Sequence, residues 1–306
     1  MAERVALLLK SYLGDAVMAE PVTRAARTAP FLGVRLGGAA REILHHLALN
    51  ATLPLTKAHT LGALRDDVRV LRAWRADTAL VVDRSFRAAL VARLAGVPQR
   101  IGHQRDGRGF LLTTTLVYDE TRYEASCYCD LARAAGLSVA DDRPRLVAPP
   151  LDLDLPPGGV GFQPGARYEA KRIPLAASQG LIAHLEREGR PIVLFGGAEE
   201  RELCERLATP SCTLLAGSCS IDQTLAALSR VDAFVSADTG LAHLAFGVGT
   251  PSLVVFGPTP AAKWTHGSPQ SVLQTRGGDI AILSADDLTS AYESSRSSSA
   301  SSSSPR

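Results

Sequence analysis

The stretch 233-AFVSADTGLAHLAFGVGTPSLVVF-256 passes from a strand pattern through a polar turn and a helical pattern into a second strand pattern. Residues 233–236 and 252–256 are short apolar runs of strand length, and residues 241–247 are typical of a helix. A strand, a crossover helix and another apolar strand predict a parallel sheet covered on both faces. The turn Asp238-Thr239-Gly240 then lies where the first strand ends and the helix begins.

The same order of strand, turn and helix recurs on both sides of this stretch. In the first half, apolar runs at 5–9 and 78–82 precede helical patterns that begin at residue 16 and at residue 86. In the second half, strand patterns at 160–163 and 191–195 precede helical patterns at 175–188 and 199–207. Each half therefore predicts a doubly wound α/β unit. Residues 24–55 lack a clear second strand.

A change of composition separates the two halves. The segment 148-APPLDLDLPPGG-159 holds four prolines and two glycines without a period. We predict an N-terminal domain over 1–150, a linker over 151–158, a C-terminal domain over 159–293 and a disordered serine-rich tail over 294–306. Ligands of such sheets bind beyond the carboxyl ends of the strands, so we expect the chemistry in the turns and a cleft between the halves.

Composition excludes several classes of protein. In 306 residues, 46% are hydrophobic and 21% charged, which allows a sizeable core, and the net charge of +2 does not favour nucleic acid as a partner. The basic segment 65–75 is interpreted as a solvated helix face. The five cysteines follow neither a disulfide nor a zinc pattern, and the apolar run 5–9 is too short for a signal peptide or a membrane span. These features predict a soluble, cytosolic protein with reduced cysteines.

Asp15 is the first candidate for chemistry, in the turn 10-KSYLGD-15 after the first strand pattern. It is interpreted either as a capping acid of the next helix or as a general base that faces the cleft. Lys10 is either a phosphate contact or a surface residue.

The second half carries three candidate turns. Gly165 follows a strand pattern in 163-QPGARYEAKRIP-174, where exposed backbone amides and Lys171 suit an anion or form a solvated basic loop. In 195-FGGAEERE-202 the acids either complement a helix dipole or bind a ribose. Thr239, Gly240 and the following amides predict a pyrophosphate site at a helix N-terminus, unless Asp238 or Thr239 merely caps the helix. His243, one turn into that helix, is interpreted as a supporting residue.

Asp238-Thr239-Gly240 also matches the motif of aspartic proteases. Those enzymes need two such elements, because two acids share one proton. This chain has one, within an alternation of strands and helices, which excludes the protease.

With these turns taken together, the chain resembles glycosyltransferase family 9, the bacterial ADP-heptose:lipopolysaccharide heptosyltransferases, and within it the heptosyltransferase II branch. The most specific matching segments are 85-SFRAALVARLAGVPQRIGH-103 and 236-SADTGLAHLAFGVGTP-251. Further matches lie within 11–21, 83–113, 163–174, 195–208 and 215–264.

The resemblance implies a GT-B fold of two Rossmann-like domains around a central cleft, with the acceptor on the N-terminal half and the ADP-sugar on the C-terminal half. It implies an inverting transfer of heptose from ADP-heptose to a lipid A–core oligosaccharide, without a metal or other cofactor. Such an enzyme works in the cytoplasm, in peripheral contact with the inner face of the inner membrane.

The resemblance also assigns roles by position. Asp15 becomes the base and Lys171 the group that neutralises the diphosphate. The donor site then comprises Gly165, Glu200 or its neighbour Glu199, Asp238, Thr239, Gly240, Leu241 and His243. The acceptor site comprises Ser85, Arg87, Arg105 and Arg108.

Ile173 departs from the tryptophan common in the family at that position. The alternatives are a family member with another nucleotide-sugar or acceptor, and a non-catalytic nucleotide-sugar-binding protein of the same fold.

Overall fold

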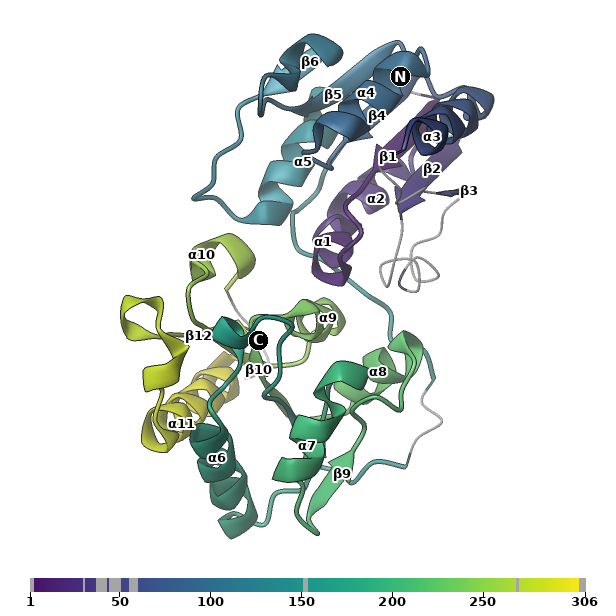
Figure 1. Cartoon of the computed structure of the whole chain (residues 1–306). Helices are drawn as coiled ribbons and strands as arrows, with labels where there is room; N and C mark the ends of the chain where they lie inside the picture. The colour runs from purple at the N-terminus through teal and green to yellow at the C-terminus, as the bar shows by residue number, and fades with distance from the viewer. Residues whose placement is uncertain are drawn as a thin grey trace. The chain divides into compact units, whose positions relative to one another are not determined.

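The computed structural model describes residues 3–29, 31–36, 43, 51–54, 60–150, 154–267 and 270–302. The chain divides into two compact units, Met1–Pro144 and Arg145–Arg306. In its described part each unit contains one six-stranded parallel sheet with helices on both faces, as Figure 1 shows. The two units are described separately below.

The sheet of the first unit has the strand order β3-β2-β1-β4-β5-β6, which is the Rossmann order. The order reverses between β1 and β4, where Leu7 lies opposite Leu80 and Leu8 opposite Val81. The strands are β1 Arg4–Leu8, β2 Phe31–Leu36, β3 Ala51–Pro54, β4 Thr78–Val81, β5 Gln99–His103 and β6 Thr114–Leu116. The helices are α1 Leu13–Met18, α2 Glu20–Ala26, α3 Leu61–Trp74, α4 Phe86–Leu94, η2 Arg108–Leu111 and α5 Glu124–Ala134.

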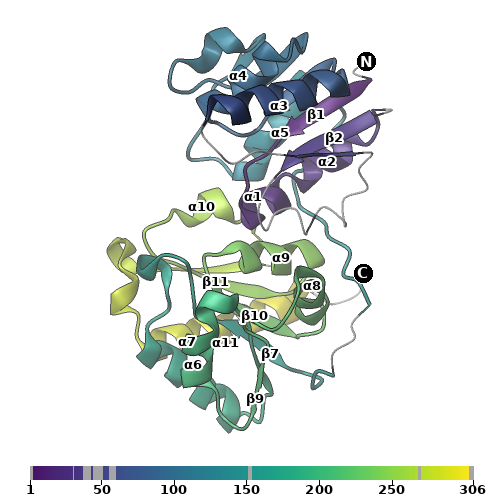
Figure 2. The same cartoon turned by 45° about the vertical axis from the view of Figure 1, so that its right-hand side comes forward.

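Helices cover this sheet in two pairs. Figures 1 and 2 show α3 and α4 on one face and α2 and α5 on the other. Buried Leu8, Leu71 and Val91 belong to the core beneath α3 and α4. The basic residues Arg65, Arg69 and Arg72 of α3 point to solvent, which confirms that segment 65–75 is a solvated helix face.

The second unit repeats the topology. Its order, β12-β11-β10-β7-β8-β9, reverses between β7 and β10. The strands are β7 Val160–Gln163, β8 Ile192–Leu194, β9 Cys212–Leu214, β10 Ala233–Ala237, β11 Ser252–Phe256 and β12 Gln270–Gln274. The helices are η3 Glu169–Lys171, α6 Leu175–Arg187, η4 Ala198–Glu200, α7 Arg201–Leu207, α8 Ile221–Leu228, α9 Gly240–Val248, α10 Ala261–Trp264, η5 Arg276–Gly278, η6 Ile280–Ile282 and α11 Ala285–Ser302.

The predicted doubly wound α/β class is confirmed, and the quoted opening stretch is β10, α9 and β11. The expectation that residues 24–55 lack a clear second strand is wrong, because β2 and β3 lie within them. Glycine, arginine and proline within these two strands interrupt the apolar run by which the other strands are recognised.

The boundary between the units lies before the proline-rich segment. Leu146 belongs to the second unit because its backbone N–H donates to the Gly247 carbonyl at 2.8 Å and its side chain packs against that glycine. The serine-rich segment also differs from expectation. Where composition predicts disorder from residue 294, helix α11 continues to Ser302.

All five cysteines are free thiols, as predicted, and Cys127, Cys129 and Cys204 are buried. In the described ranges, no helix combines the length and the apolar character that crossing a membrane requires.

Candidate functional site

In the first unit the candidate residues follow the two strands between which the order reverses. Lys10 and Asp15 follow β1, and Arg84 follows β4. Asp15 does not cap its helix: Tyr12 is the N-cap of α1 and makes no side-chain capping bond. The Asp15 carboxylate instead lies 2.7 Å from the Lys10 ammonium. The interpretation of Asp15 as a capping acid is therefore wrong.

Helix α5 supplies two partners for this ion pair that the sequence reading missed. The Tyr128 hydroxyl lies 2.7 Å from Asp15 Oδ1 and 2.7 Å from Glu124 Oε1. Lys10 Nζ lies 3.2 Å from the same Glu124 oxygen. Glu124 and Tyr128 are four residues apart, so both project from one face of α5. That helical spacing was the one available signal, and only the fold shows what the face meets.

The Glu124 carboxylate is completely buried and surrounded by donors. Tyr118 donates a short hydrogen bond to its second oxygen, and Arg84 lies 3.7 Å from the first. Burial alone raises the pKa of Glu124, but the charge of Lys10 and the hydrogen bonds from the two tyrosines outweigh burial and hold the pKa below its ordinary value. Glu124 is therefore ionised at neutral pH.

Arg84 is another residue that the sequence reading missed. Its guanidinium stacks on the Tyr118 ring at 3.9 Å from the ring centre. Its Nε and Nη1 have no hydrogen-bond partner among the described residues. Burial lowers the pKa of Arg84, yet Glu124 and other neighbouring acids outweigh burial and raise it. A charged group with unused donors at a strand end suits a phosphate or a carboxylate.

The four residues predicted to meet an acceptor separate into two kinds. Arg108 is completely buried, and its guanidinium donates to the carbonyls of His103, Asp83 and Ser85 at 3.0, 2.7 and 2.8 Å. It joins the ends of β4 and β5 and does not face solvent, so its expected acceptor contact is corrected to a structural role.

Ser85 and Arg87 also have partners within the unit. Ser85 caps α4 through a 3.2 Å bond from the Ala88 N–H, and Arg87 pairs at 2.5 Å with buried Asp67. Ser85 and Arg105 are both exposed, and the Arg105 guanidinium lies 3.3 Å from the Asp106 carboxylate.

In the second unit Lys171 and Asp238 likewise follow the two strands at the reversal, β7 and β10, whereas Glu200 follows β8. The loop after β7 carries Lys171, whose Nζ lies 2.5 Å from Asp238 Oδ2 in the turn after β10. The Asp238 side chain is 5% exposed and that of Lys171 24%. The structure thus brings together two predicted residues that are far apart in the sequence, and leaves part of the ammonium open to solvent.

Thr239 is the N-cap of α9, and its hydroxyl oxygen accepts the Leu241 N–H at 3.3 Å. The hydroxyl donates to Gln163 Oε1 at 2.6 Å, a partner that the sequence reading missed. Backbone amides of the first helical turn, such as that of Gly240, are further donors there, and the phosphate contact of Thr239 stays a prediction. His243 is buried, with its ring 6.3 Å from that of Trp264, and its supporting role stays a prediction.

Glu200 lies over the ends of β7 and β8. Its Oε2 accepts the Gly197 N–H at 2.7 Å, whereas Glu199 is exposed. A Cβ atom on Gly165 would stand 2.3 Å from Glu200 Cγ, so a glycine is required for this approach. Beside Glu200 lies a cavity of about 440 Å³, which Arg172, Ile173 and Leu203 also line. This volume is within the range of small-ligand sites.

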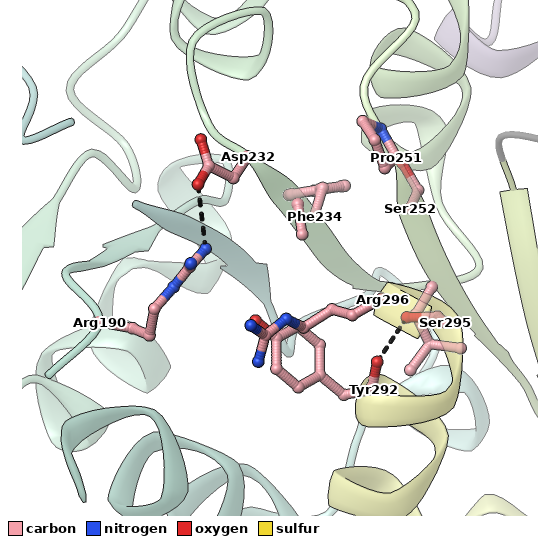
Figure 3. Close-up of a pocket in the computed structure, with 10 residues that line it drawn as sticks. Arg190, Asp232, Phe234, Pro251, Ser252, Tyr292, Ser295 and Arg296 are labelled. Atoms are coloured by element: carbon pink, nitrogen blue, oxygen red, sulfur yellow. Dashed lines mark hydrogen bonds and ion pairs between the residues drawn. The ribbon is translucent and has the colours of Figure 1, made fainter. Parts of the chain in front are cut away.

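A smaller cavity of about 160 Å³ lies at the opposite edge of the same sheet. Figure 3 shows Arg190 facing Asp232 there, with Tyr292 and Arg296 from α11 beside them. Strands β10 and β11 begin at this edge, whereas ligands of doubly wound sheets bind where the strands end. This cavity is therefore separate from the candidate site.

One cluster in the described ranges has ligand atoms close enough together for a metal: His184, Glu188 and Glu293. Arg296 lies 2.9 Å from Glu188 and 3.3 Å from Glu293, so the chain itself supplies a positive charge to both carboxylates. The cluster joins α6 to α11 and is not at the strand ends.

Comparison with known proteins gives consistent results. The sequence model of glycosyltransferase family 9 (heptosyltransferase) matches residues 66–278. The chain is 28% identical to lipopolysaccharide heptosyltransferase 2 of Escherichia coli K12, over 84% of this chain and 83% of the relative.

Solved structures agree. ADP-heptose lipopolysaccharide heptosyltransferase II of E. coli superposes with a TM-score of 0.80 at 24% identity, over 97% of this chain and 99% of the other. An E. coli heptosyltransferase solved with ADP gives a TM-score of 0.80 at 21% identity, over 95% and 99%. The expected GT-B class, with two Rossmann-like units, is confirmed.

The structural role of Arg108 is testable. We expect Arg108→Ala to lower the free energy of unfolding by about 3 kcal/mol, because three carbonyls lose a buried, charged donor. Urea unfolding followed by circular dichroism measures the change. Arg105→Ala, at an exposed neighbour, is the control and changes stability by less than about 0.5 kcal/mol. Equal stability of the two variants would contradict the assignment.

Proposed function

The chain belongs to glycosyltransferase family 9, and from that membership we propose that it transfers a heptose from ADP-heptose to the inner core of a lipopolysaccharide. The observation that carries the proposal is the Lys171–Asp238 pair beside the capped N-terminus of α9. A cation and helix amides at the strand ends of a Rossmann-like unit suit the diphosphate of a nucleotide-sugar.

The second unit then binds the donor. The amides of the first turn of α9 and the Lys171 ammonium stabilise the charge that develops on ADP as the bond from C1 of the heptose to the phosphate oxygen breaks. Asp238 holds Lys171 in place at 2.5 Å. Glu200 is placed to accept from ribose hydroxyls, next to the 440 Å³ cavity. We propose that these protein groups stabilise the departing ADP without a metal ion.

The first unit supplies the base. Asp15 takes the proton of the acceptor hydroxyl while its oxygen forms a bond to C1, and ADP departs with the electron pair of the broken bond. Attack opposite the leaving group inverts the anomeric centre. The Lys10 ammonium lies 2.7 Å from this carboxylate and holds it in place as the proton acceptor. Arg84 and Arg105 are suited to phosphorylated sugars of the acceptor.

We also propose a peripheral membrane contact, since the acceptor is anchored to lipid. Phe86 and Phe110 are 46% and 74% exposed, and their ring centres lie 6.1 Å apart. Phe86 follows strand β4 and Phe110 follows β5 at the carboxyl edge, and exposed Arg105 lies in the segment between β5 and Phe110. Paired exposed aromatic rings with a neighbouring cation are typical of surfaces that insert into an anionic bilayer.

Replacement of the base separates chemistry from binding. We expect Asp15→Asn to lower kcat by about 10²- to 10⁴-fold, because the proton of the acceptor loses its base. ADP release in the presence of ADP-heptose and lipopolysaccharide truncated within the inner core measures the rate. ADP binding, measured by calorimetry, remains close to that of the unchanged protein. A fully active Asp15→Asn variant would contradict the assignment.

Replacement of Lys171 is expected to weaken the binding of ADP, which the replacement of Asp15 leaves unchanged. We expect Lys171→Met to weaken ADP binding by about 10- to 100-fold, because one charged contact to the diphosphate is lost. Calorimetry in buffer that contains EDTA measures it, with Arg187→Met, an exposed cation on α6, as the matched control. The unchanged protein binds ADP more tightly than UDP or GDP. Preference for UDP or GDP would point to another nucleotide-sugar.

The membrane contact is tested by sedimentation with vesicles that contain phosphatidylglycerol. We expect the double variant Phe86→Ser with Phe110→Ser to lose most vesicle binding, because the apolar anchor is removed. Leu61→Ser is the control, since Leu61 is 74% exposed but stands on α3. Equal loss in the control would show that the contact is not local to the two phenylalanines.

A further inference from the structure

A second, completely buried carboxylate lies beside the proposed base and has no role in the mechanism above. The Lys10 ammonium contacts both acids, at 2.7 Å to Asp15 and 3.2 Å to Glu124. The Tyr128 hydroxyl also lies between them, at 2.7 Å from each, and accepts from Lys10 at 3.1 Å. Two acids therefore share one ammonium and one hydroxyl.

The Tyr128 hydroxyl has one proton and so donates to one carboxylate at a time. Burial raises the pKa of Tyr128 well above its ordinary value, and the two carboxylates raise it further. The hydroxyl therefore keeps its proton, and only the direction of its hydrogen bond can change. The hydroxyl can make one of two hydrogen bonds of equal length, either to Asp15 or to Glu124.

The surroundings of Glu124 keep it charged throughout. Besides Lys10 and Tyr128, the described groups that face it are Arg84, after β4, and Tyr118, after β6. His103 of β5 stacks edge-on against Tyr118, and burial lowers its pKa to about 4, so it is neutral near pH 7. Asp15 itself faces Lys10 and Tyr128.

We propose that Glu124 and Tyr128 are positioning residues for Asp15, and that Glu124 takes over Lys10 and the Tyr128 hydrogen bond when Asp15 accepts the acceptor's proton. This inference rests on the proposed function of Asp15. A neutral Asp15 no longer balances Lys10, whose side chain is only 18% exposed. With Glu124 at 3.2 Å, the ammonium keeps a charged partner, and the hydroxyl exchanges its hydrogen bond to Asp15 for one to Glu124 without any covalent bond of Tyr128 changing.

Two substitutions are expected to move the acidic limb of the pH profile of kcat/KM in opposite directions. Glu124→Gln removes a negative neighbour and leaves Lys10 and Tyr128 to Asp15 alone, so the limb moves to lower pH, by about one unit. The plateau rate falls, because Asp15 becomes a weaker base. Tyr128→Phe removes a donor to the ionised Asp15, so the limb moves to higher pH.

The matched control for the tyrosine is Tyr292→Phe, which changes another completely buried tyrosine, in the second unit. Its hydroxyl has no hydrogen-bond partner among the described residues, and the limb should not move. Thermal unfolding of each variant verifies the fold. Should Glu124→Gln fail to fold, the shift of the acidic limb in Tyr128→Phe alone tests the positioning role.

The outcomes separate this inference from the proposed function. If the unchanged protein transfers heptose and Asp15→Asn abolishes transfer, the function stands. Variants of Glu124 and Tyr128 that then lose stability but leave the limb in place would overturn the positioning role. If the unchanged protein transfers no heptose, the proposed function itself fails.

Discussion

Parallel strand order is the constraint on which the candidate site depends. When every strand of a sheet runs the same way, all carboxyl ends meet at one edge, and the crossovers diverge where the order reverses. In the first unit this point lies between β1 and β4, and in the second between β7 and β10. The turns after these strands carry Lys10, Asp15, Lys171 and Asp238, and the repeated topology explains why each unit has one such group.

Compensation of buried charge governs the side chains at those points. Each lysine of the site has a carboxylate partner: Lys10 has Asp15 and Glu124, and Lys171 has Asp238. A buried ion that lost its only partner would be costly, so a group that changes charge during a reaction benefits from a second partner nearby. The first unit has such a partner and gives its lysine two acids. The second gives its lysine one acid and leaves part of the lysine side chain exposed to solvent.

Most elements around the site could be predicted, because apolar runs bounded by polar turns are a local property. Strands β1, β4, β7 and β10 and the helices after them match the predicted ranges closely. Strands β2 and β3 were missed, since they include residues that weaken the apolar pattern. Arg108 illustrates the limit at the level of a side chain: an arginine in a turn looks exposed in the sequence, yet here it is buried against three carbonyls.

The sequence by itself determined the class of the fold and the family, and it named the turns in which we expect the chemistry, because these depend on residues close together along the chain. It also placed Asp15, Lys171 and Asp238 at strand ends. Only the tertiary structure decided the partners of those residues. Glu124 and Asp15 are joined by the packing of α5 against the strands, and the distance between two carboxylates far apart in the chain is set by the fold. Charge pairing is a three-dimensional property, and no local pattern records it.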